Sequence, residues 1–304
     1  MVRKNRTIAE ISALILILAC GLFLAYRIEQ QNSEQAQLES RIAELKEQNK
    51  EIQNNILAKK QEVLSQTTDI GHIRQMEETA AAAKENYYKV ARQLEDAVIG
   101  GQASCKIAYL TFDDGPYLNT TGKYLDVLDQ YGILATFFQI GRPAEELDPV
   151  YRRVYESGHT VANHTYSHQI RNGIYRGVDY FISDVIRNRE FIEEKLGITT
   201  NILRFPGGSP SAGASKPAIV EELRKLGYGY VDWNSATGDG VQMMTPAEYR
   251  DNVLNKTGGR NILVVLMHDY SANTLAALPE IIEGLQDQGY IFLPLFYESS
   301  MVNK

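Results

Sequence analysis

Hydrophobic and polar positions divide the chain into three stretches of different texture. From 8 to 26 the residues are almost all apolar, with Glu10 as the one charge. From 27 to about 100, sparse aliphatic residues recur at helical spacing among Gln, Glu, Lys and Asn. From 106 onward, short apolar runs alternate with amphipathic helical patterns. The three textures predict a membrane anchor helix (1–27), a helical stalk (28–100) and a globular α/β domain (101–304).

The first stretch has the length and the flanking charges of a membrane anchor. A membrane span needs about 17–25 residues, and 8–26 is just long enough. Arg3, Lys4 and Arg6 precede it, and the positive-inside rule then places the N-terminus in the cytoplasm and the rest of the chain outside. A lipoprotein signal at Cys20 and a cleaved secretory signal are the alternatives. An uncleaved, single-pass anchor in the cell membrane is favoured because the apolar run continues beyond Cys20.

The second stretch carries a heptad pattern that is typical of a coiled coil. Its positions are spaced mostly by four and three residues: Leu38, Ile42, Leu45, Asn49, Ile52, Ile56 and Val63. A second helical pattern, from 76 to 98, places Tyr87, Val90, Ala91 and Leu94 on one face. The functional interpretation is a stalk that holds the next domain off the membrane, with a homodimer through the stalk as a possible consequence. A single amphipathic helix, or a helical hairpin that turns at Gly71, is the alternative.

The third stretch predicts repeated strand–helix units. Strands are expected at 106–112, 134–140, 159–162, 201–205, 228–233, 262–267 and 291–295. Helices are expected at 122–131, 150–157, 180–196, 216–226, 245–255 and 272–288. Such alternation indicates a parallel sheet, and about seven units predict a distorted (β/α) barrel. In barrels of this kind the functional site lies at the carboxyl ends of the strands.

Polar clusters stand at five of the predicted strand ends. They are Asp113-Asp114, the segment 164–168, Arg204 with the turn that follows it, Asp232-Trp233, and His268-Asp269. Five such clusters at one end of a sheet are hard to explain by solubility alone. Singly, they have plain structural interpretations, because Asp-Gly-Pro is good turn chemistry and an arginine can form a surface ion pair. His159, which begins a strand, is assigned a structural role.

Two of the clusters together suggest a metal site. Two histidines four residues apart, His164 and His168, can face one point if the segment makes a helical turn. The carboxylate of Asp114 would complete a set of two His and one Asp, with open positions for water and substrate. This is the ligand pattern of a catalytic metal site and differs from the closed set of a structural one.

The remaining polar residues fit acid–base work beside such a metal. Asp113 would be free to take a proton from the attacking water, and His268 could act as general acid on the leaving group. Arg204 could hold Asp113 ionised, since a nearby cation favours the charged form. Asp232 could support His268 or Arg204. The turn at 206–208 offers backbone N–H groups to an oxyanion.

The region from about 106 to 295 resembles the polysaccharide deacetylases of carbohydrate esterase family 4. Four blocks match the motifs of that family: TFDDGP at 111–116, HTYSH at 164–168, RFPGG at 204–208 and LMH at 266–268. The remaining motif, D-x-x-D-W, is partial, because 229–233 reads GYVDW and lacks the first Asp. The joint match is highly specific and covers about two thirds of the chain.

The resemblance implies a distorted (β/α) barrel that removes acetyl groups from an N-acetylated sugar polymer with the help of a divalent metal. It implies the same roles as those argued above from the places of these residues at the strand ends. Asp113 is the base, His268 is the acid, and Arg204 orients the base. The metal ligands are Asp114, His164 and His168. The backbone N–H of Gly207 is expected to bind the oxyanion. Trp233 and Tyr166 are expected to contact substrate. The metal is expected to be zinc, although cobalt or nickel also suits the ligand set.

An exported enzyme on a stalk would meet cell-wall glycan, so the expected substrate is peptidoglycan. Chitin oligomers and a capsule polymer are alternatives, and the sequence does not distinguish N-acetylglucosamine from N-acetylmuramic acid. A net charge of -7, from 38 acids and 31 bases, argues against a nucleic-acid partner. Two other classes remain: a hydrolase of a small amide or imide with the same fold, which export disfavours, and a non-enzymatic wall-binding or assembly protein. The presence of all six polar site residues argues against the last class.

Overall fold

The computed structural model describes residues 70–103, 105–171 and 173–304, together with 33, 35–38, 40–45 and 47–48 nearer the N-terminus. The predicted membrane helix at 8–26 and the heptad positions from Asn49 to Val63 lie outside these residues. Within the described part of the chain, no helix is both long enough and apolar enough to span a membrane.

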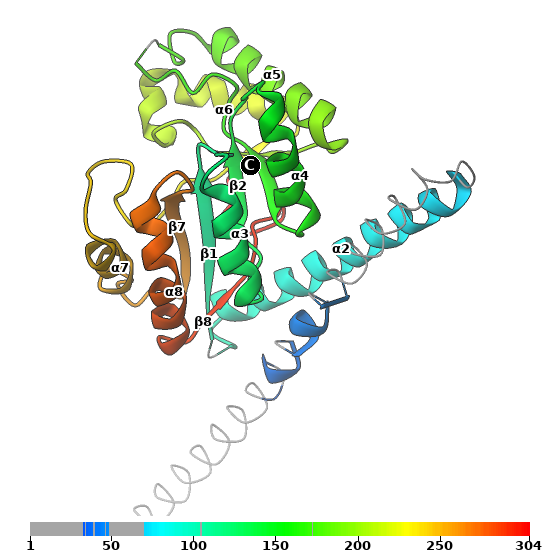
Figure 1. The fold of residues 1–304 in the computed structure, drawn as a ribbon, viewed down its shortest axis with the longest axis vertical. Coiled ribbons are helices and arrows are strands. Elements are labelled where there is room, and N and C mark those ends of the chain that lie inside the picture. Colours follow the sequence, from blue (N-terminus) through cyan, green and yellow to red (C-terminus); the bar gives the residue numbers. More distant parts are fainter. Residues whose placement is uncertain are drawn as a thin grey trace, which may run out of the picture.

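One parallel sheet forms the centre of the α/β domain (Figure 1). Its strands are β1 (Lys106–Asp113), β2 (Thr136–Gln139), β3 (Thr160–Asn163), β4 (Ile202–Leu203), β5 (Gly229–Tyr230), β6 (Ser235–Ala236), β7 (Ile262–His268) and β8 (Tyr290–Phe292). Seven of them follow the order β5-β4-β3-β2-β1-β7-β6, and β8 pairs with the first residues of β1. Every strand pair is parallel, as the sequence pattern predicted. The sheet curls into a partial barrel, with β5 and β6 at the two ends of its path.

Helices follow most of the strands and lie on the outer face of the sheet (Figure 1). They are α3 (Thr121–Gln130), α4 (Asp148–Glu156), α5 (Val178–Leu196), α6 (Lys216–Lys225), α7 (Pro246–Leu254) and α8 (Ala272–Asp287), with short 3-10 segments at Glu145–Leu147 and Ser209–Ser215. The predicted helices end within a few residues of these bounds. Strand β6 was not predicted, because two residues without an apolar run give no periodic signal.

Strand β1 shows how the alternation of side chains divides the core. Every second residue packs beneath the outer helices: Ala108, Leu110 and Phe112. Ile107 and Tyr109 point the other way, into the inner core of the barrel. Because neighbouring side chains on a strand point to opposite faces, Thr111 and Asp113 continue the inner row. Asp114 lies just beyond the strand, where its backbone turns into the left-handed region with φ = 70°.

Helix α2 (Ile70–Ile99) packs against the amino end of the barrel through its carboxyl-terminal half, coloured cyan in Figure 1. The buried residues of this half join the inner core: Tyr87, Val90, Ala91, Leu94 and Val98. Ile42 and Leu45 from the helical residues 40–45 join the same core. Glu95 is fully buried, and its carboxylate accepts hydrogen bonds from the Ser300 N–H and from Arg92, both at 2.9 Å. The predicted apolar face of the second helix is therefore confirmed, and it packs on the α/β domain.

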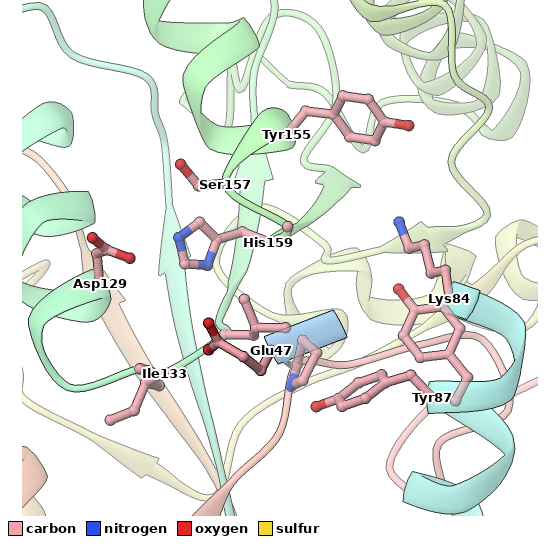
Figure 2. Close-up of a pocket in the computed structure, with 13 residues that line it drawn as sticks. Glu47, Lys84, Tyr87, Asp129, Ile133, Tyr155, Ser157 and His159 are labelled. Atoms are coloured by element: carbon pink, nitrogen blue, oxygen red, sulfur yellow. The ribbon is translucent and has the colours of Figure 1, made fainter. Parts of the chain in front are cut away.

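A cavity of about 100 Å³ lies between α2 and the amino ends of β2 and β3 (Figure 2). Lys84 and Tyr87 of α2 line one side of it, and Ile133 and His159 line the other. His159 is buried, and its Nδ1 accepts a hydrogen bond from the Ala135 N–H at 3.1 Å. Burial lowers the pKa of His159 to about 3, so the imidazole stays neutral, which suits a structural role. The cavity is at the opposite end of the strands from the predicted polar clusters.

Candidate active site

The polar residues that follow β1, β3, β4 and β7 meet at the carboxyl end of the sheet. Asp113 and His268 are register partners across β1 and β7. His164 comes directly after β3, and Arg204 comes directly after β4. Because parallel strands all point the same way, their last residues share one edge, and the contacts described next join these four side chains.

Asp114, His164 and His168 form a compact group of three possible metal ligands. Their ligand atoms all lie within 4.8 Å of one another. Asp114 Oδ1 is 3.4 Å from His164 Nε2 and 3.1 Å from His168 Nε2. A tetrahedral zinc ion with bonds of about 2.0–2.2 Å separates its ligand atoms by about 3.3 Å. The three side chains therefore have the spacing that a divalent metal requires.

Hydrogen bonding and charge also fit this ligand set to a metal. The Nδ1 of His164 lies 2.8 Å from the carbonyl oxygen of Arg204, so Nδ1 donates its proton and Nε2 keeps a lone pair. Burial lowers the pKa of His168 to about 4, so that ring is neutral near pH 7. Burial opposes ionisation of Asp114, but the neighbouring imidazoles hold its pKa below the usual range. Asp114 Oδ1 is buried without a hydrogen-bond partner, which is costly unless a ligand satisfies it.

The backbone around these ligands is strained. In the described part of the chain, three non-glycine residues have positive φ: Asp114 at 70°, Thr165 at 66° and His168 at 49°. Such conformations cost about 1–3 kcal/mol each and persist only where surrounding contacts hold them. Thr165 is held at both ends, since its N–H donates to Asn163 Oδ1 at 2.8 Å and its Oγ1 accepts from the His168 N–H at 3.2 Å. The strain is thus concentrated in the segment that aims the ligands.

Arg204 holds Asp113 from inside the barrel. The guanidinium is fully buried, and its Nη1 donates to Asp113 Oδ1 at 2.9 Å and to Thr111 Oγ1 at 2.7 Å. Burial lowers the pKa of Arg204 and the charge of Asp113 opposes this, but arginine keeps its proton in either case. The other oxygen of Asp113, Oδ2, lies 3.6 Å from His164 Nε2 and so faces the ligand group. Asp113 therefore pairs with Arg204, whereas Asp114 lies between the two imidazoles of the ligand group.

His268 is held by Asp239, a residue that the sequence analysis did not single out. Its Nδ1 lies 2.7 Å from Asp239 Oδ1, and its N–H donates to Asp239 Oδ2 at 3.0 Å. Thr274 Oγ1 donates to the same Oδ2 at 2.7 Å. Burial opposes the charged imidazole, but the bond to Asp239 and the charges of Asp113, Asp239 and Asp114 raise the pKa of His268 to about 9. His268 therefore carries a proton at neutral pH, and its Nε2 lies 3.9 Å from Asp114 Oδ2.

The sequence offered little to identify Asp239. It follows β6, the two-residue strand that has no apolar run, and it stands between Gly238 and Gly240. The available signal was a Gly-Asp-Gly turn between a strand end and a helix. Gly240 is required by close approach, because a Cβ at this position would lie 2.5 Å from Cε1 of His268. Asp239 holds the imidazole by hydrogen bonds, and Gly240 leaves the space that the imidazole occupies.

Asp232 does not contact His268. Its Oδ1 accepts the Ser209 N–H at 2.8 Å and its Oδ2 accepts the Ser209 hydroxyl at 2.5 Å. Its main-chain oxygen accepts a long bond, 3.4 Å, from Arg204 Nη2. Of the two supporting contacts that the sequence analysis considered, the structure places Asp232 beside Arg204 and gives the contact with His268 to Asp239. The reason is topological, since Asp232 follows β5 and His268 ends β7, far along the sheet order.

Gly207 and Trp233 lie on the β4–β5 side of the cluster. Gly207 is exposed, with φ = 72°, and among the described residues no acceptor contacts its N–H. This N–H is therefore available to an oxyanion. Trp233 is half-buried, with its ring 5.7 Å from the guanidinium carbon of Arg204, and it borders Gly208.

Tyr166 packs away from the other predicted site residues. Its ring meets Phe191 of α5 edge-on at 5.7 Å, and the guanidinium of Arg187 lies 3.6 Å from the ring centroid. It also fills the space beside Gly141, where a Cβ would lie 2.2 Å from the ring. The contacts of Tyr166 are thus those of a packing residue between the β2–α4 connection and α5.

Comparisons with known proteins agree with this arrangement. A family model described as polysaccharide deacetylase matches residues 100–231. A peptidoglycan-N-acetylglucosamine deacetylase of Bacillus cereus is 32% identical over 204 residues, which cover 64% of this chain and 71% of the relative. A chitooligosaccharide deacetylase of Azorhizobium caulinodans is 30% identical, over 62% of this chain and 91% of the relative.

Solved structures give the same result for the fold. The catalytic domain of a peptidoglycan N-acetylglucosamine deacetylase from Eubacterium rectale superposes with a TM-score of 0.61 and 34% identity, over 66% of this chain and 93% of that one. A CE4 esterase from Streptococcus mutans superposes with a TM-score of 0.59 and 32% identity, over 66% and 91%. The chain therefore belongs to the polysaccharide deacetylases of carbohydrate esterase family 4 and is an enzyme that hydrolyses N-acetyl groups.

Proposed function

We propose that this chain is a metal-dependent N-deacetylase of peptidoglycan, held outside the cell membrane by its N-terminal helix. The observation that carries the proposal is the arrangement around Asp114, His164 and His168. Next to that ligand group stand a carboxylate, Asp113, whose Oδ2 lies 3.6 Å from His164 Nε2, and a protonated imidazole, His268, whose Nε2 lies 3.9 Å from Asp114 Oδ2. A base and an acid beside one metal site are what hydrolysis of an amide requires.

The metal and the side chains have separate tasks in this proposal. A divalent metal bound by Asp114, His164 and His168 supplies polarisation of the acetyl carbonyl and activation of water. We assign this position to zinc, and cobalt or nickel also suits two imidazoles and one carboxylate. Every other step belongs to the side chains and the backbone of the chain itself.

Two proton transfers accompany the reaction, one from water to Asp113 and one from His268 to the leaving amine. Asp113, oriented by Arg204, accepts a proton from the attacking water as its oxygen bonds to the acetyl carbon. The Gly207 N–H donates to the carbonyl oxygen while negative charge develops there. His268 then gives its Nε2 proton to the amine nitrogen as the C–N bond breaks. The products are acetate and a free amino group on the sugar.

The substrate and the location rest on the relatives and on the N-terminal sequence. The Bacillus cereus and Eubacterium rectale proteins are peptidoglycan N-acetylglucosamine deacetylases, which supports N-acetylglucosamine of the cell wall as the substrate. The apolar stretch 8–26 with its preceding bases supports a single-pass anchor that leaves the enzyme outside the membrane. A membrane-held enzyme of this kind would act on the glycan strands nearest to it.

The test measures acetate release by the full-length protein in detergent on N-acetylated peptidoglycan, with and without a chelator. We expect acetate release that the chelator stops and that added zinc restores. Labelling free amines before acid hydrolysis of the glycan then identifies the amino sugar, and we expect glucosamine. The proposal would be wrong if peptidoglycan gave no chelator-sensitive acetate, and labelled muramic acid would reassign the sugar.

A further inference from the structure

An aromatic wall stands beside the proposed catalytic group, between the ends of β1 and β7. Tyr117 follows the Gly115-Pro116 turn, and Tyr270 comes two residues after His268. The two rings meet edge to face, 5.5 Å apart and inclined by 73°. Tyr270 also lies 5.1 Å from the imidazole of His268, and 37% of its surface is exposed. The wall therefore borders the imidazole of His268 and is partly open to solvent.

Arg142 adds a positive charge to the same wall. Its guanidinium carbon lies 4.3 Å from the centroid of the Tyr117 ring. Its backbone N–H donates to the Tyr151 hydroxyl at 3.1 Å, which fixes the base of the side chain. Its Nη2 reaches the main-chain oxygen of Asp114 at 3.4 Å. The charge is thus held next to a residue of the metal ligand group.

Among the described residues, no carboxylate forms an ion pair with this guanidinium. Arg204 pairs with Asp113 and Arg153 pairs with Asp126, but within the described part of the chain no carboxylate lies at ion-pair distance from Arg142. Its Nε is buried and has no acceptor. Buried donors of this kind are normally satisfied, and the planar fork of arginine matches a carboxylate with two parallel bonds. The side chain therefore retains donors for an acidic ligand.

We propose that Arg142 binds a carboxylate on the sugar unit next to the one that is deacetylated, while Tyr117 and Tyr270 support that sugar. The inference rests on the proposed function and sharpens it. Free lactyl carboxylates distinguish glycan strands without their stem peptides from a neutral polymer of N-acetylglucosamine, and a charged hydrogen bond is among the stronger ways to make that distinction. Aromatic faces suit the apolar side of a sugar ring.

The hydroxyl groups of Tyr117 and Tyr270 are compatible with a bound carboxylate. Burial raises the pKa of Tyr117 to about 12, and burial with the charges of Asp239 and Asp114 raises the pKa of Tyr270 above its ordinary value. Both tyrosines are therefore neutral at any pH at which the enzyme would work. They add hydrogen-bonding groups to the wall and no negative charge that would repel a carboxylate.

The test compares three tetrasaccharides on the full-length protein. The first alternates N-acetylglucosamine with peptide-free N-acetylmuramic acid, the second is the same chain with its lactyl carboxylates converted to methyl amides, and the third is the N-acetylglucosamine tetramer. The quantity measured is the ratio of kcat/KM for the acidic chain to that for its amide. We expect Arg142→Gln to lower this ratio about tenfold, mainly through KM, and Arg142→Lys to keep most of it. Arg176→Gln, which removes an exposed arginine stacked on Tyr180 at 3.6 Å, is the matched control and should leave the ratio unchanged.

Two results would overturn the inference. One is a wild-type protein that does not prefer the acidic chain to its amide. The other is an Arg142→Gln variant that loses the same factor on all three tetrasaccharides, because a purely structural role beside Asp114 would act on every substrate alike. A wild-type protein that released acetate from none of the three would instead contradict the proposed function, so the two failures are distinguishable.

Discussion

The carboxyl and amino ends of the strands in the parallel sheet have different roles. At the carboxyl end, β1 and β7 finish in Asp113 and His268, and strained backbone aims the ligands that follow β1 and β3. At the amino end, the inner faces of these strands meet the apolar side of α2, where Leu94 is fully buried. The first end carries buried charges that burial itself disfavours, and the second contributes apolar burial that offsets them.

The difference shows that α2 contributes side chains to the core of the α/β domain. Part of the stretch predicted as a stalk packs on the inner core, and Glu95 joins it to the backbone at Ser300. Substitutions at the carboxyl end should therefore change activity with little change in stability. Substitutions at the amino end should do the reverse.

The largest effect is expected for His268→Ala. Removal of the proposed acid should lower kcat by about 10²–10⁴, because nothing else at the site presents a proton to the leaving amine. Metal content should stay close to that of the wild type, since the side chain is not among the three ligands. Acetate release and metal analysis of one preparation measure both. Activity within tenfold of the wild type would remove His268 from its assigned role.

The next effect belongs to the amino end and is expected for Leu94→Ala. Deleting a fully buried leucine should lower the free energy of unfolding by about 2–5 kcal/mol, as measured by denaturant titration. The exposed neighbour Gln93 is the matched control, and Gln93→Ala should change stability by less than about 0.5 kcal/mol. The folded fraction of Leu94→Ala should keep the kcat of the wild type. A loss of kcat without a loss of stability would mean that α2 acts on the catalytic group.

A smaller effect is expected for Asp239→Asn. The substitution removes the charge that raises the pKa of His268, so the imidazole should lose its proton at lower pH. The alkaline limb of the pH profile of kcat/KM should move down by about one unit, which lowers activity up to about tenfold on that limb. Asp232→Asn is the control, because the Asp232 carboxylate binds Ser209 and should not move the limb. A shift in both variants, or in neither, would contradict the assignment of Asp239.

The smallest effect is expected from His159, at the amino end. Its pKa is about 3 in the folded protein and about 6.5 in an unfolded chain, so the fold excludes the charged form. Stability should be nearly full well above pH 6.5 and should fall as the pH drops through it, with a slope that approaches about 1.4 kcal/mol per unit below about pH 5.5. His159→Gln should remove this part of the pH dependence, measured as the difference in unfolding free energy between pH 7.5 and 5.5. An unchanged difference would show that His159 does not contribute to it.

The parts of this molecule that the sequence predicted are those with a repeating signal. Apolar runs located the long strands, and their carboxyl ends located Asp113, His164 and His268. Each of these inferences depends on the backbone period alone.

The parts that the sequence did not predict depend on tertiary placement. Asp239 follows a strand of two residues, so no pattern pointed to it, and Asp232 occupied the expected position without the expected contact with His268. The apolar face of α2 was visible in the sequence, but which surface it covers was not. The contact of Tyr166 with substrate stays a prediction; in the structure its ring packs on Phe191.

The central claim is that the adjacent aspartates divide the work, Asp113 moving a proton and Asp114 holding the metal. The measurement that tests it most directly is the metal content of purified Asp113→Asn and Asp114→Asn, each paired with acetate release. We expect Asp113→Asn to keep about one metal per chain and to lose activity by about 10³ or more. Asp114→Asn should lose both metal and activity. Loss of metal from the Asp113 variant, or full metal in the Asp114 variant, would contradict the account.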